Sequence, residues 1–394
     1  MLQATARDFA QQELKPAVAE VQRLKRANIP HQPWDVCKDA VKKGAELGFN
    51  KLLIPEQYGG LGRDCIDHVI IQEELATAGG GITGYFAATF PMMIVIGGTE
   101  EQKNRWLPEI CSSEVFILAS AGNEPDVAGS DFLCPYPDPK IGIKTFARRE
   151  GDEYIINGCK AAFCTHAGVA DAYFVMARTD LSRPMRESSS TFYVPADTPG
   201  LSFGKNTEML GQCTMHHSEV YLDDVRVPET NRIGGEGELS SLFVIKCLPY
   251  FGTGLAAIYT GLARAAYDYA SAYAHERKSW GQPIVRHQAV TLKLADMLVN
   301  IEAARLMTWD AACAIDSGSH LANMKSTAAK TLAVDTAIQC AENAVKILGG
   351  YGVAEEYETV RMLQDAWMGY SCDGTRDTLR LGMMAFLEMA QGSG

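Results

Sequence analysis

The stretch from residue 153 to residue 228 decides the fold class, because its short β-rich runs separate two long helical blocks. Gly, Pro or Asp residues follow these runs or close them, as turn residues do at strand ends. The runs are EYIINGCKAAF (153–163), AYFVMA (172–177), TFYVPADTPG (191–200) and EVYLDDVRVP (219–228). They predict strands of an antiparallel sheet. In the last run the apolar alternation slips between Leu222 and Val225, so we expect a β-bulge near Asp223–Asp224.

Helical periodicity lies on both sides of this stretch. Before it, apolar residues recur at steps of three and four from Phe9 to Leu24. After it, one predicted apolar stripe consists of Leu294, Met297, Leu298, Ile301 and Ala304. We therefore expect an α+β multi-domain chain. Its expected parts are a helical domain over 1–113, a middle β domain over 114–235 and a helical bundle over 236–394.

Composition excludes several classes of protein. With 394 residues, 47% hydrophobic and 21% charged, the chain is neither disordered nor collagen-like. A formal net charge of −12 argues against a nucleic-acid partner. No apolar run reaches the ~18–20 residues that span a bilayer, so we expect no membrane insertion. The first residues carry no secretory signal. We expect a bacterial-type cytoplasmic location, or the mitochondrial matrix for a chain whose transit segment was removed.

The cysteines and histidines do not predict a metal site or a disulfide framework. The eleven cysteines are scattered from Cys37 to Cys372 without a C-x-x-C motif, and the eight histidines show no H-E-x-x-H motif. We therefore expect reduced thiols and no bound metal.

Three motifs can carry chemistry, and their residue types alone leave each of them open. In ERKSWGQP (276–283), Arg277 can pair with a phosphate, but the same motif suits a solvated helix end. In AGNEPDVAGSD (121–131), Ser130 and backbone N–H groups can hold an anion, but a plain loop is the alternative. In YSCDGTRD (370–377), Asp373 followed by Gly374 is typical of a turn.

The order of eight sequence pieces resembles the acyl-CoA dehydrogenase family over essentially the whole chain. The pieces are PEQYGGLG (55–62), GTEEQKNRWLP (98–108), NEPDVAGSD (123–131), INGCKAAF (156–163), DDVRVP (223–228), ERKSWGQPI (276–284), HQAVTLKLADM (287–297) and LGGYG…CDGT (348–375). The resemblance implies an N-terminal helical domain, a β-barrel-like middle domain and a C-terminal four-helix bundle, assembled as a homotetramer. It also implies removal of a proton from Cα and a hydride from Cβ of an acyl-CoA thioester. FAD would take the hydride, and an electron-transferring flavoprotein would reoxidise the flavin.

The resemblance assigns the substrate site to two segments. The carboxylate base of the family's late Y-E-G-T motif falls on Asp373, and its backbone N–H is expected to hold the thioester carbonyl. Gly374 lets the chain pass close to the ligand. Phe251 falls where some relatives carry their base, and Gly252 falls where the family has an Arg. We expect both to contact the substrate.

Two groups of residues are implied for FAD. In the first, Phe163 replaces a Trp wall and Thr165 donates to the flavin, while Asn123 stands where a Thr contacts it. Ser130 should reach the pyrophosphate, and Thr375 of the late motif is also expected at the cofactor. The second group resembles residues that a neighbouring subunit lends to the FAD tail. It consists of Arg277, Trp280, Gln288, Lys346, Gly349 and Gly350.

Departures from the family pattern leave more than one function open. Asp373 is one methylene shorter than Glu, about 1.5 Å by ordinary bond lengths. Gly252 removes a cation and is expected to open volume near the thioester, and loop 121–131 is one residue longer at Asp126–Val127. These changes suit a dehydrogenase for a branched or alicyclic acyl group. They also suit variant flavin chemistry, such as acyl-CoA reduction or another elimination. A catalytically silent assembly subunit is the third alternative, but the retained Asp373, Thr165 and Arg277 favour an active enzyme.

Overall fold

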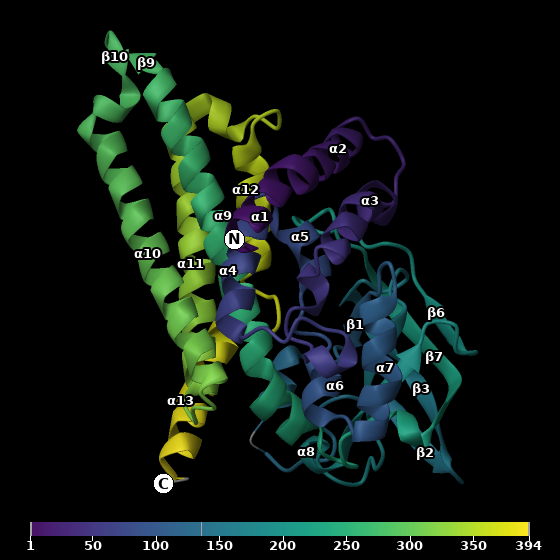
Figure 1. Cartoon of the computed structure of the whole chain (residues 1–394). Coiled ribbons are helices and arrows are strands. Elements are labelled where there is room, and N and C mark those ends of the chain that lie inside the picture. Colours follow the sequence, from purple (N-terminus) through teal and green to yellow (C-terminus); the bar gives the residue numbers. More distant parts are fainter. Residues whose placement is uncertain (1, 135, 393–394) are drawn as a thin grey trace.

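The computed structural model describes residues 2–134 and 136–392, in three successive parts (Figure 1). The first part is helical and ends before the first strand. Its helices are α1 (Leu2–Phe9), α2 (Lys15–Arg26), α3 (Pro33–Glu46), α4 (Cys65–Ala76), α5 (Gly80–Thr83), α6 (Met92–Gly97) and α7 (Glu100–Ser112). Helix α7 begins with a capping box, in which Thr99 and Gln102 each accept the other's backbone N–H through their side chains.

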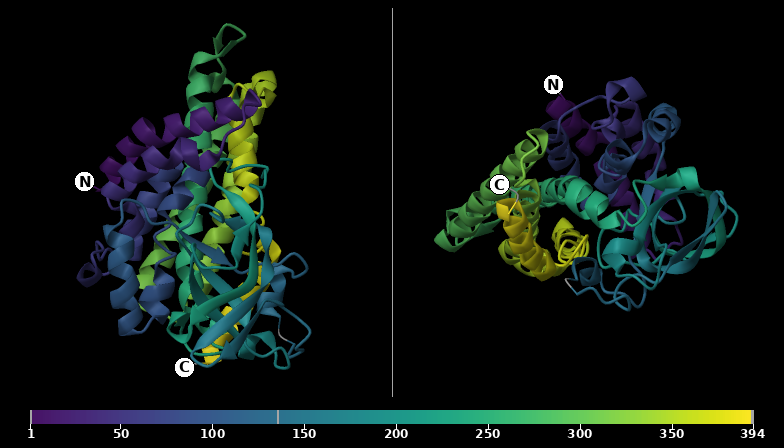
Figure 2. Two further views of the ribbon diagram at one scale, coloured as in Figure 1. Left: turned by 90° about the vertical axis from the view of Figure 1, so that its right-hand side faces the viewer. Right: turned by 90° about the horizontal axis from the view of Figure 1, so that it is seen from below.

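The second part is a curled sheet that lies beside the helices (Figure 2). Its strands are β1 (Leu118–Ala121), β2 (Phe146–Glu150), β3 (Glu153–Thr165), β4 (Ala172–Arg178), β5 (Ser189–Pro195), β6 (Leu201–Phe203), β7 (His217–Pro228) and β8 (Arg232–Ile233), and the short α8 (Met185–Ser188) precedes β5. The strand order is β6-β7-β3-β2-β4-β5-β8, and β1 pairs with β4 in parallel. The predicted middle sheet is therefore confirmed, but it is mixed and not purely antiparallel, because β4 pairs with β1 and β2 in parallel.

The predicted bulge is also present, on β7 where it pairs with β3. Val225 faces Ile156 while Leu222 faces Gly158, so three residues of β7 advance against two of β3. Asp224 in this bulge has a left-handed backbone with a φ of 51°. The sequence slip thus marked a real register shift.

The third part consists of long helices that pack side by side. They are α9 (Leu248–Glu276), α10 (Gln288–Asp316) and α11 (Ala322–Leu348), with the shorter α12 (Glu358–Met368) and α13 (Arg376–Gly392) packed on α11. The hairpin of β9 (Lys278–Ser279) and β10 (Gln282–Pro283) projects from the top of the bundle (Figure 1). Among the described residues, none of the helices combines the length and the apolar character that crossing a bilayer requires.

The predicted stripe of α10 is correct except at Leu298. The side chains of Leu294, Met297, Ile301 and Ala304 are buried. Leu298 is 41% exposed, because one residue after Met297 the helix has turned by 100° toward its outer face.

Buried ion pairs join the first part to the bundle. Glu73 of α4 pairs with Arg264 of α9 at 3.0 Å and with Arg305 of α10 at 2.8 Å. Its neighbour Glu74 pairs with Arg7 at 2.8 Å. Burial alone would raise the pKa of Glu74, but hydrogen bonds from Arg7 and Arg264 lower it to about 2. These pairs hold α4 against α9, the helix that also contributes to the candidate site.

Candidate active site

Asp373 lies in the loop between α12 and α13, where the backbone is left-handed. Its φ is 46°, and that of Gly374 is 97°. An L-residue reaches this conformation only at a cost in energy, whereas Gly reaches it freely. The Asp–Gly pair therefore makes the tight turn that its sequence predicted, and this turn lies against α11.

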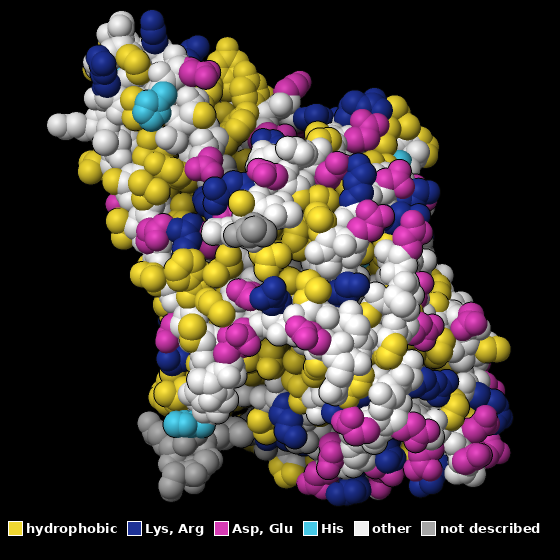
Figure 3. All heavy atoms as spheres, in the orientation of Figure 1, with side chains coloured by type: hydrophobic (Ala, Val, Ile, Leu, Met, Phe, Trp, Pro, Cys, Tyr) yellow, Lys and Arg dark blue, Asp and Glu magenta, His cyan; other side chains and the backbone are white. Residues whose placement is uncertain are grey.

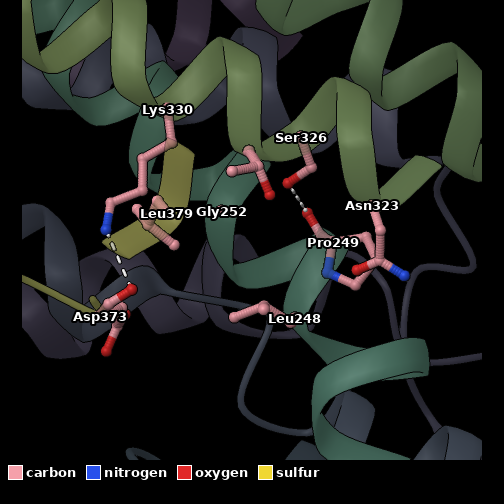
Figure 4. Close-up of a pocket in the computed structure, with 9 residues that line it drawn as sticks. Leu248, Pro249, Gly252, Asn323, Ser326, Lys330, Asp373 and Leu379 are labelled. Atoms are coloured by element: carbon pink, nitrogen blue, oxygen red, sulfur yellow. Dashed lines mark hydrogen bonds between the residues drawn. The ribbon is translucent and has the colours of Figure 1, made fainter. Parts of the chain in front are cut away.

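Asp373 lines a small pocket between this loop, the start of α9 and one face of α11 (Figure 4). The other lining residues are Leu248, Pro249, Gly252, Asn323, Ser326, Thr327, Lys330 and Leu379. Asp373 and Gly252 are far apart in the sequence, and both were assigned to the substrate site. The fold brings them to one pocket.

Gly252 lies against α11 on the side where another residue would carry its Cβ atom. A Cβ atom built there would lie 2.5 Å from Oγ of Ser326, which itself donates to the carbonyl of Pro249 at 2.8 Å. The space expected to open at Gly252 is thus occupied on this side by Ser326. Close packing of two helices, rather than an enlarged acyl site, explains why glycine fits here.

Phe251 is a core residue rather than a lining residue of this pocket. Its side chain is 7% exposed, and its ring lies 5.4 Å from that of Phe90 and 5.7 Å from that of Phe243. Met93 and Ile94 belong to the same buried cluster. The position that carries a base in some relatives is therefore filled by an aromatic wall beside the pocket.

Lys330 of α11 reaches the same pocket, and the sequence motifs did not point to it. It is 2% exposed, and its Nζ donates to the carbonyls of Cys372, Asp373 (3.1 Å) and Gly374 (3.2 Å). Burial lowers the pKa of this ammonium, while the nearby Asp373 carboxylate acts in the opposite direction. The sequence feature that could have pointed to Lys330 is its position one turn after Ser326, on the buried face of an Ala-rich helix.

The first predicted cofactor group lies at the rim of the sheet. Phe163 is 53% exposed, and Thr165 is half-buried two residues later at the end of β3. Asn123 follows β1, and its carbonyl accepts from the Ala161 N–H at 2.9 Å. Ser130 is exposed farther along the same loop. The structure therefore gathers Asn123, Phe163 and Thr165 where β1 and β3 adjoin.

A buried ion pair between Lys160 and Glu124 anchors loop 121–131 to the sheet. Lys160 is fully buried, and its Nζ donates to Glu124 at 2.8 Å and to the Met176 carbonyl at 2.6 Å. Glu124 also accepts from the backbone N–H groups of Lys144 and Thr145. Burial would raise the pKa of Glu124, but Lys160 beside it holds that pKa below its ordinary value. Sequence reasoning named neither residue as part of the site.

The extra residue of the loop is absorbed in a tight turn. Val127 N–H donates to the Glu124 carbonyl at 3.3 Å, and the Val127 side chain is buried. The longer loop therefore keeps a defined shape between its anchor and Ser130.

The second predicted cofactor group gathers at the top end of the bundle. Trp280 and Gly281 have φ values of 51° and 76°, as the two central residues of a type I′ hairpin turn require. The Arg277 guanidinium lies 5.6 Å from the ring centroid of Tyr351, just after the Gly349–Gly350 pair. Trp280 is 91% exposed. Gln288, Lys346, Gly349 and Gly350 are exposed at the same end.

One chain does not bring the two cofactor groups together. Helix α9 rises about 36 Å between Gly252 and Glu276 at 1.5 Å per residue. The hairpin therefore lies at the far end of the bundle from the pocket, and the sheet rim lies in the middle part (Figure 1). Thr375, also expected at the cofactor, is exposed at the start of α13, where its hydroxyl shares a 2.8 Å hydrogen bond with that of Thr378.

A helical part, a curled sheet and a helical bundle follow one another along the chain, and this order defines the class of fold that is compared with known proteins. Three family models match the chain in order: the acyl-CoA dehydrogenase N-terminal domain over 1–114, the middle domain over 119–225 and the C-terminal domain over 243–387. The chain belongs to the acyl-CoA dehydrogenase family, oxidoreductases that act on CH–CH groups.

Three similar proteins illustrate the range of the family. A 3-(aryl)acrylate reductase of Clostridium sporogenes is 35% identical over 97% of this chain and 96% of its own. A cyclohex-1-ene-1-carbonyl-CoA dehydrogenase of Syntrophus aciditrophicus is 30% identical over 97% of this chain and 87% of its own. The structure of butyryl-CoA dehydrogenase from Megasphaera elsdenii superimposes with a TM-score of 0.88 at 30% identity, covering 98% of this chain and 97% of that one.

Proposed function

We propose that the chain is an FAD-dependent acyl-CoA dehydrogenase in which Asp373 removes the α-proton. The observation that carries this proposal is the meeting of Asp373 and Gly252 at one pocket. Phe251, at the alternative base position, has no group that accepts a proton. Asp373 is therefore the carboxylate assigned to proton removal.

The α-proton of a thioester is a weak acid, so proton removal needs a polarised carbonyl and a base held beside it. The backbone N–H of Asp373 polarises the thioester carbonyl. The Asp373 carboxylate takes the proton from Cα. The cofactor, when bound, supplies the acceptor for the hydride from Cβ.

The residues at the two ends suit FAD by their chemistry. Hydroxyl and amide groups at the sheet rim (Thr165, Asn123 and Ser130) match the polar edge of a flavin and a pyrophosphate, and Phe163 offers an exposed flat wall. At the bundle end, Arg277 and Lys346 suit phosphate oxygens. A Cβ built at Gly349 or Gly350 would meet no atom within 4 Å, which leaves room for a ligand to approach the backbone. We infer that the bundle end of one subunit completes the cofactor site of another.

The outer face of α10 supports assembly, for which we propose a homotetramer. Leu292, Val299 and Leu306 follow one another at seven-residue steps and are 64%, 68% and 60% exposed. Hydrophobic side chains are visible along this edge of the molecule (Figure 3). Contiguous apolar surface of this kind marks an interaction site.

For the substrate, we propose a branched or alicyclic acyl-CoA. The shorter Asp373 suits a Cα that lies closer to the loop, and one relative is a dehydrogenase of an alicyclic acyl-CoA. We propose an electron-transferring flavoprotein as the redox partner and the cytoplasm as the location, both from family membership.

A second candidate function is the reverse reaction, reduction of an unsaturated acyl group. A relative at 35% identity over 97% of this chain is a 3-(aryl)acrylate reductase. In this direction the protonated Asp373 carboxyl group would give its proton to Cα.

One screen separates the candidates. Saturated straight-chain, branched and alicyclic acyl-CoA esters are mixed anaerobically with the purified yellow protein, and bleaching of the flavin absorbance is recorded. Bleaching by a branched or alicyclic ester supports the first proposal. Reoxidation of dithionite-reduced protein by aryl-unsaturated esters, with no bleaching by saturated ones, supports the second. Protein that takes up no FAD excludes both and favours a silent assembly subunit.

A further inference from the structure

Lys330 holds three consecutive carbonyl groups of the loop that carries the proposed base. We propose that Lys330 is a positioning residue that strengthens the Asp373 backbone N–H as a hydrogen-bond donor to the thioester carbonyl. This inference rests on the proposed function of Asp373.

The three acceptors around Lys330 match its charged form. Its Nζ donates to the carbonyls of Cys372, Asp373 and Gly374. A neutral amine has two N–H donors, whereas an ammonium has three and no acceptor. Three carbonyl acceptors around one nitrogen therefore match an ammonium, and Figure 4 shows its direction toward the Asp373 carbonyl.

The surroundings explain why this cation stays buried. Within the described part of the chain, Lys330 forms no ion pair with a carboxylate, so carbonyl dipoles are its acceptors. A buried charge without hydrogen bonds would cost several kcal/mol. The three successive carbonyls that Lys330 contacts lie in a tight turn, in which Asp373 and Gly374 adopt the left-handed conformation. The lysine and the turn thus support each other.

The effect on the reaction follows from the peptide bond. The carbonyl of Cys372 and the N–H of Asp373 belong to the same planar, conjugated peptide group. Hydrogen bonds in series polarise one another, most strongly in a low-dielectric site. The ammonium on the Cys372 carbonyl therefore makes the Asp373 N–H a stronger donor. That N–H is the group that stabilises negative charge on the thioester oxygen when the α-proton leaves.

The test measures how strongly the site stabilises negative charge on the thioester oxygen. It uses a substrate analogue that is not dehydrogenated. A 3-thia-acyl-CoA ester has an acidic α-proton, and its bound enolate gives a long-wavelength charge-transfer absorbance with oxidised flavin. A pH titration of this absorbance in the FAD-loaded protein gives the pKa of the bound analogue. Lys330→Met should weaken its ionisation about two- to fivefold, because the lysine acts through the peptide group and not by a direct bond to the analogue. Lys330→Gln, which keeps N–H donors without the charge, should lie between.

The control is Lys325→Met on the same helix, where Lys325 pairs with the partly exposed Asp310 at 2.7 Å. It should leave the analogue's pKa unchanged. A wild-type pKa in Lys330→Met or Lys330→Gln would overturn the role of the charge. Loss of the folded protein in both variants would leave Lys330 a structural role only and would also overturn the proposal. Failure of the wild-type protein to ionise the analogue would instead overturn the proposed function of Asp373.

Discussion

The two ends of the C-terminal bundle differ in how completely one chain builds them. At the Asp373 end, α9, α11 and the loop line a small pocket, and a buried lysine holds the loop through its carbonyls. At the Arg277 end, the hairpin and the Gly349–Gly350 turn present exposed side chains, among them Trp280 at 91% exposure.

The difference shows which part of the chemistry a single chain can organise. Proton removal needs a base and a donor held within hydrogen-bonding reach, and both groups proposed for it lie in the Asp373 loop of one chain. Binding of a long cofactor tail needs charge and space, and we propose that the Arg277 end, the open end, offers these to a second molecule. We therefore expect substitutions at the Asp373 end to change the reaction rate, and substitutions at the open end to change cofactor retention.

The largest expected effect is that of Asp373→Asn, because the amide keeps the shape but cannot accept a proton at neutral pH. Flavin reduction by a good acyl-CoA ester should slow by about 10²–10⁴-fold in stopped-flow measurements. The FAD content should be unchanged. An undiminished rate would place the base elsewhere and remove the contrast between the two ends.

The matched variant Asp373→Glu sharpens this test. The longer side chain should crowd a bulky α-carbon, so activity should shift toward straight-chain esters. An unchanged order of substrates would show that the length of the carboxylate does not select the acyl group.

The next effect concerns the open end. Arg277→Ala should weaken FAD binding by about 1.5–3 kcal/mol, as expected for loss of a hydrogen bond to a charged group. Equilibrium dialysis of the flavin measures this, and dilution of the unmutated protein to monomers should release FAD as well. A monomer that retains FAD as tightly as the assembly would contradict a shared site.

A smaller effect is expected at the contact between Gly252 and Ser326. Alanine at 252 gains about 1 kcal/mol of helix propensity, but its Cβ displaces the Ser326 hydroxyl and breaks its bond to Pro249. The two terms nearly cancel, and steric strain of about 1 kcal/mol or more makes Gly252→Ala destabilising.

In a Ser326→Ala background the same substitution should instead stabilise the protein by about 1 kcal/mol, because the oxygen that clashes is absent. Urea denaturation of the four proteins of this cycle measures the coupling. If the effects of the two substitutions on the free energy of unfolding were additive, Gly252 of α9 and Ser326 of α11 would not be in contact.

The smallest effect is that of Trp280→Ala on the stability of the chain without cofactor. Its side chain is 91% exposed, so the free energy of unfolding should change by less than about 0.5 kcal/mol. FAD retention in the assembly should nevertheless fall, since the indole face is expected to meet the neighbouring cofactor. A large loss of stability in the cofactor-free chain would mean that Trp280 belongs to the hairpin's own structure.

Local patterns predicted much of the fold. The alternation and turn residues of 153–228 predicted the sheet, and the slip after Leu222 predicted its bulge, because both depend on near neighbours along the chain. The Asp–Gly pair likewise predicted the turn at Asp373. Family motifs then led to the residues that the structure gathers at the sheet rim and at the bundle end.

Tertiary structure alone decided how these parts act together. Lys330 contacts carbonyls 42 to 44 residues away along the chain, so no local pattern reveals that it holds the Asp373 loop. Gly252 suggested open volume in the sequence, whereas the packing of α9 on α11 places Ser326 there. Leu298 fits the spacing of its helix but faces outward, because the direction of the core depends on which helices pack against α10. Sequence spacing determines what each element can present; only the packing of distant elements determines what each side chain meets.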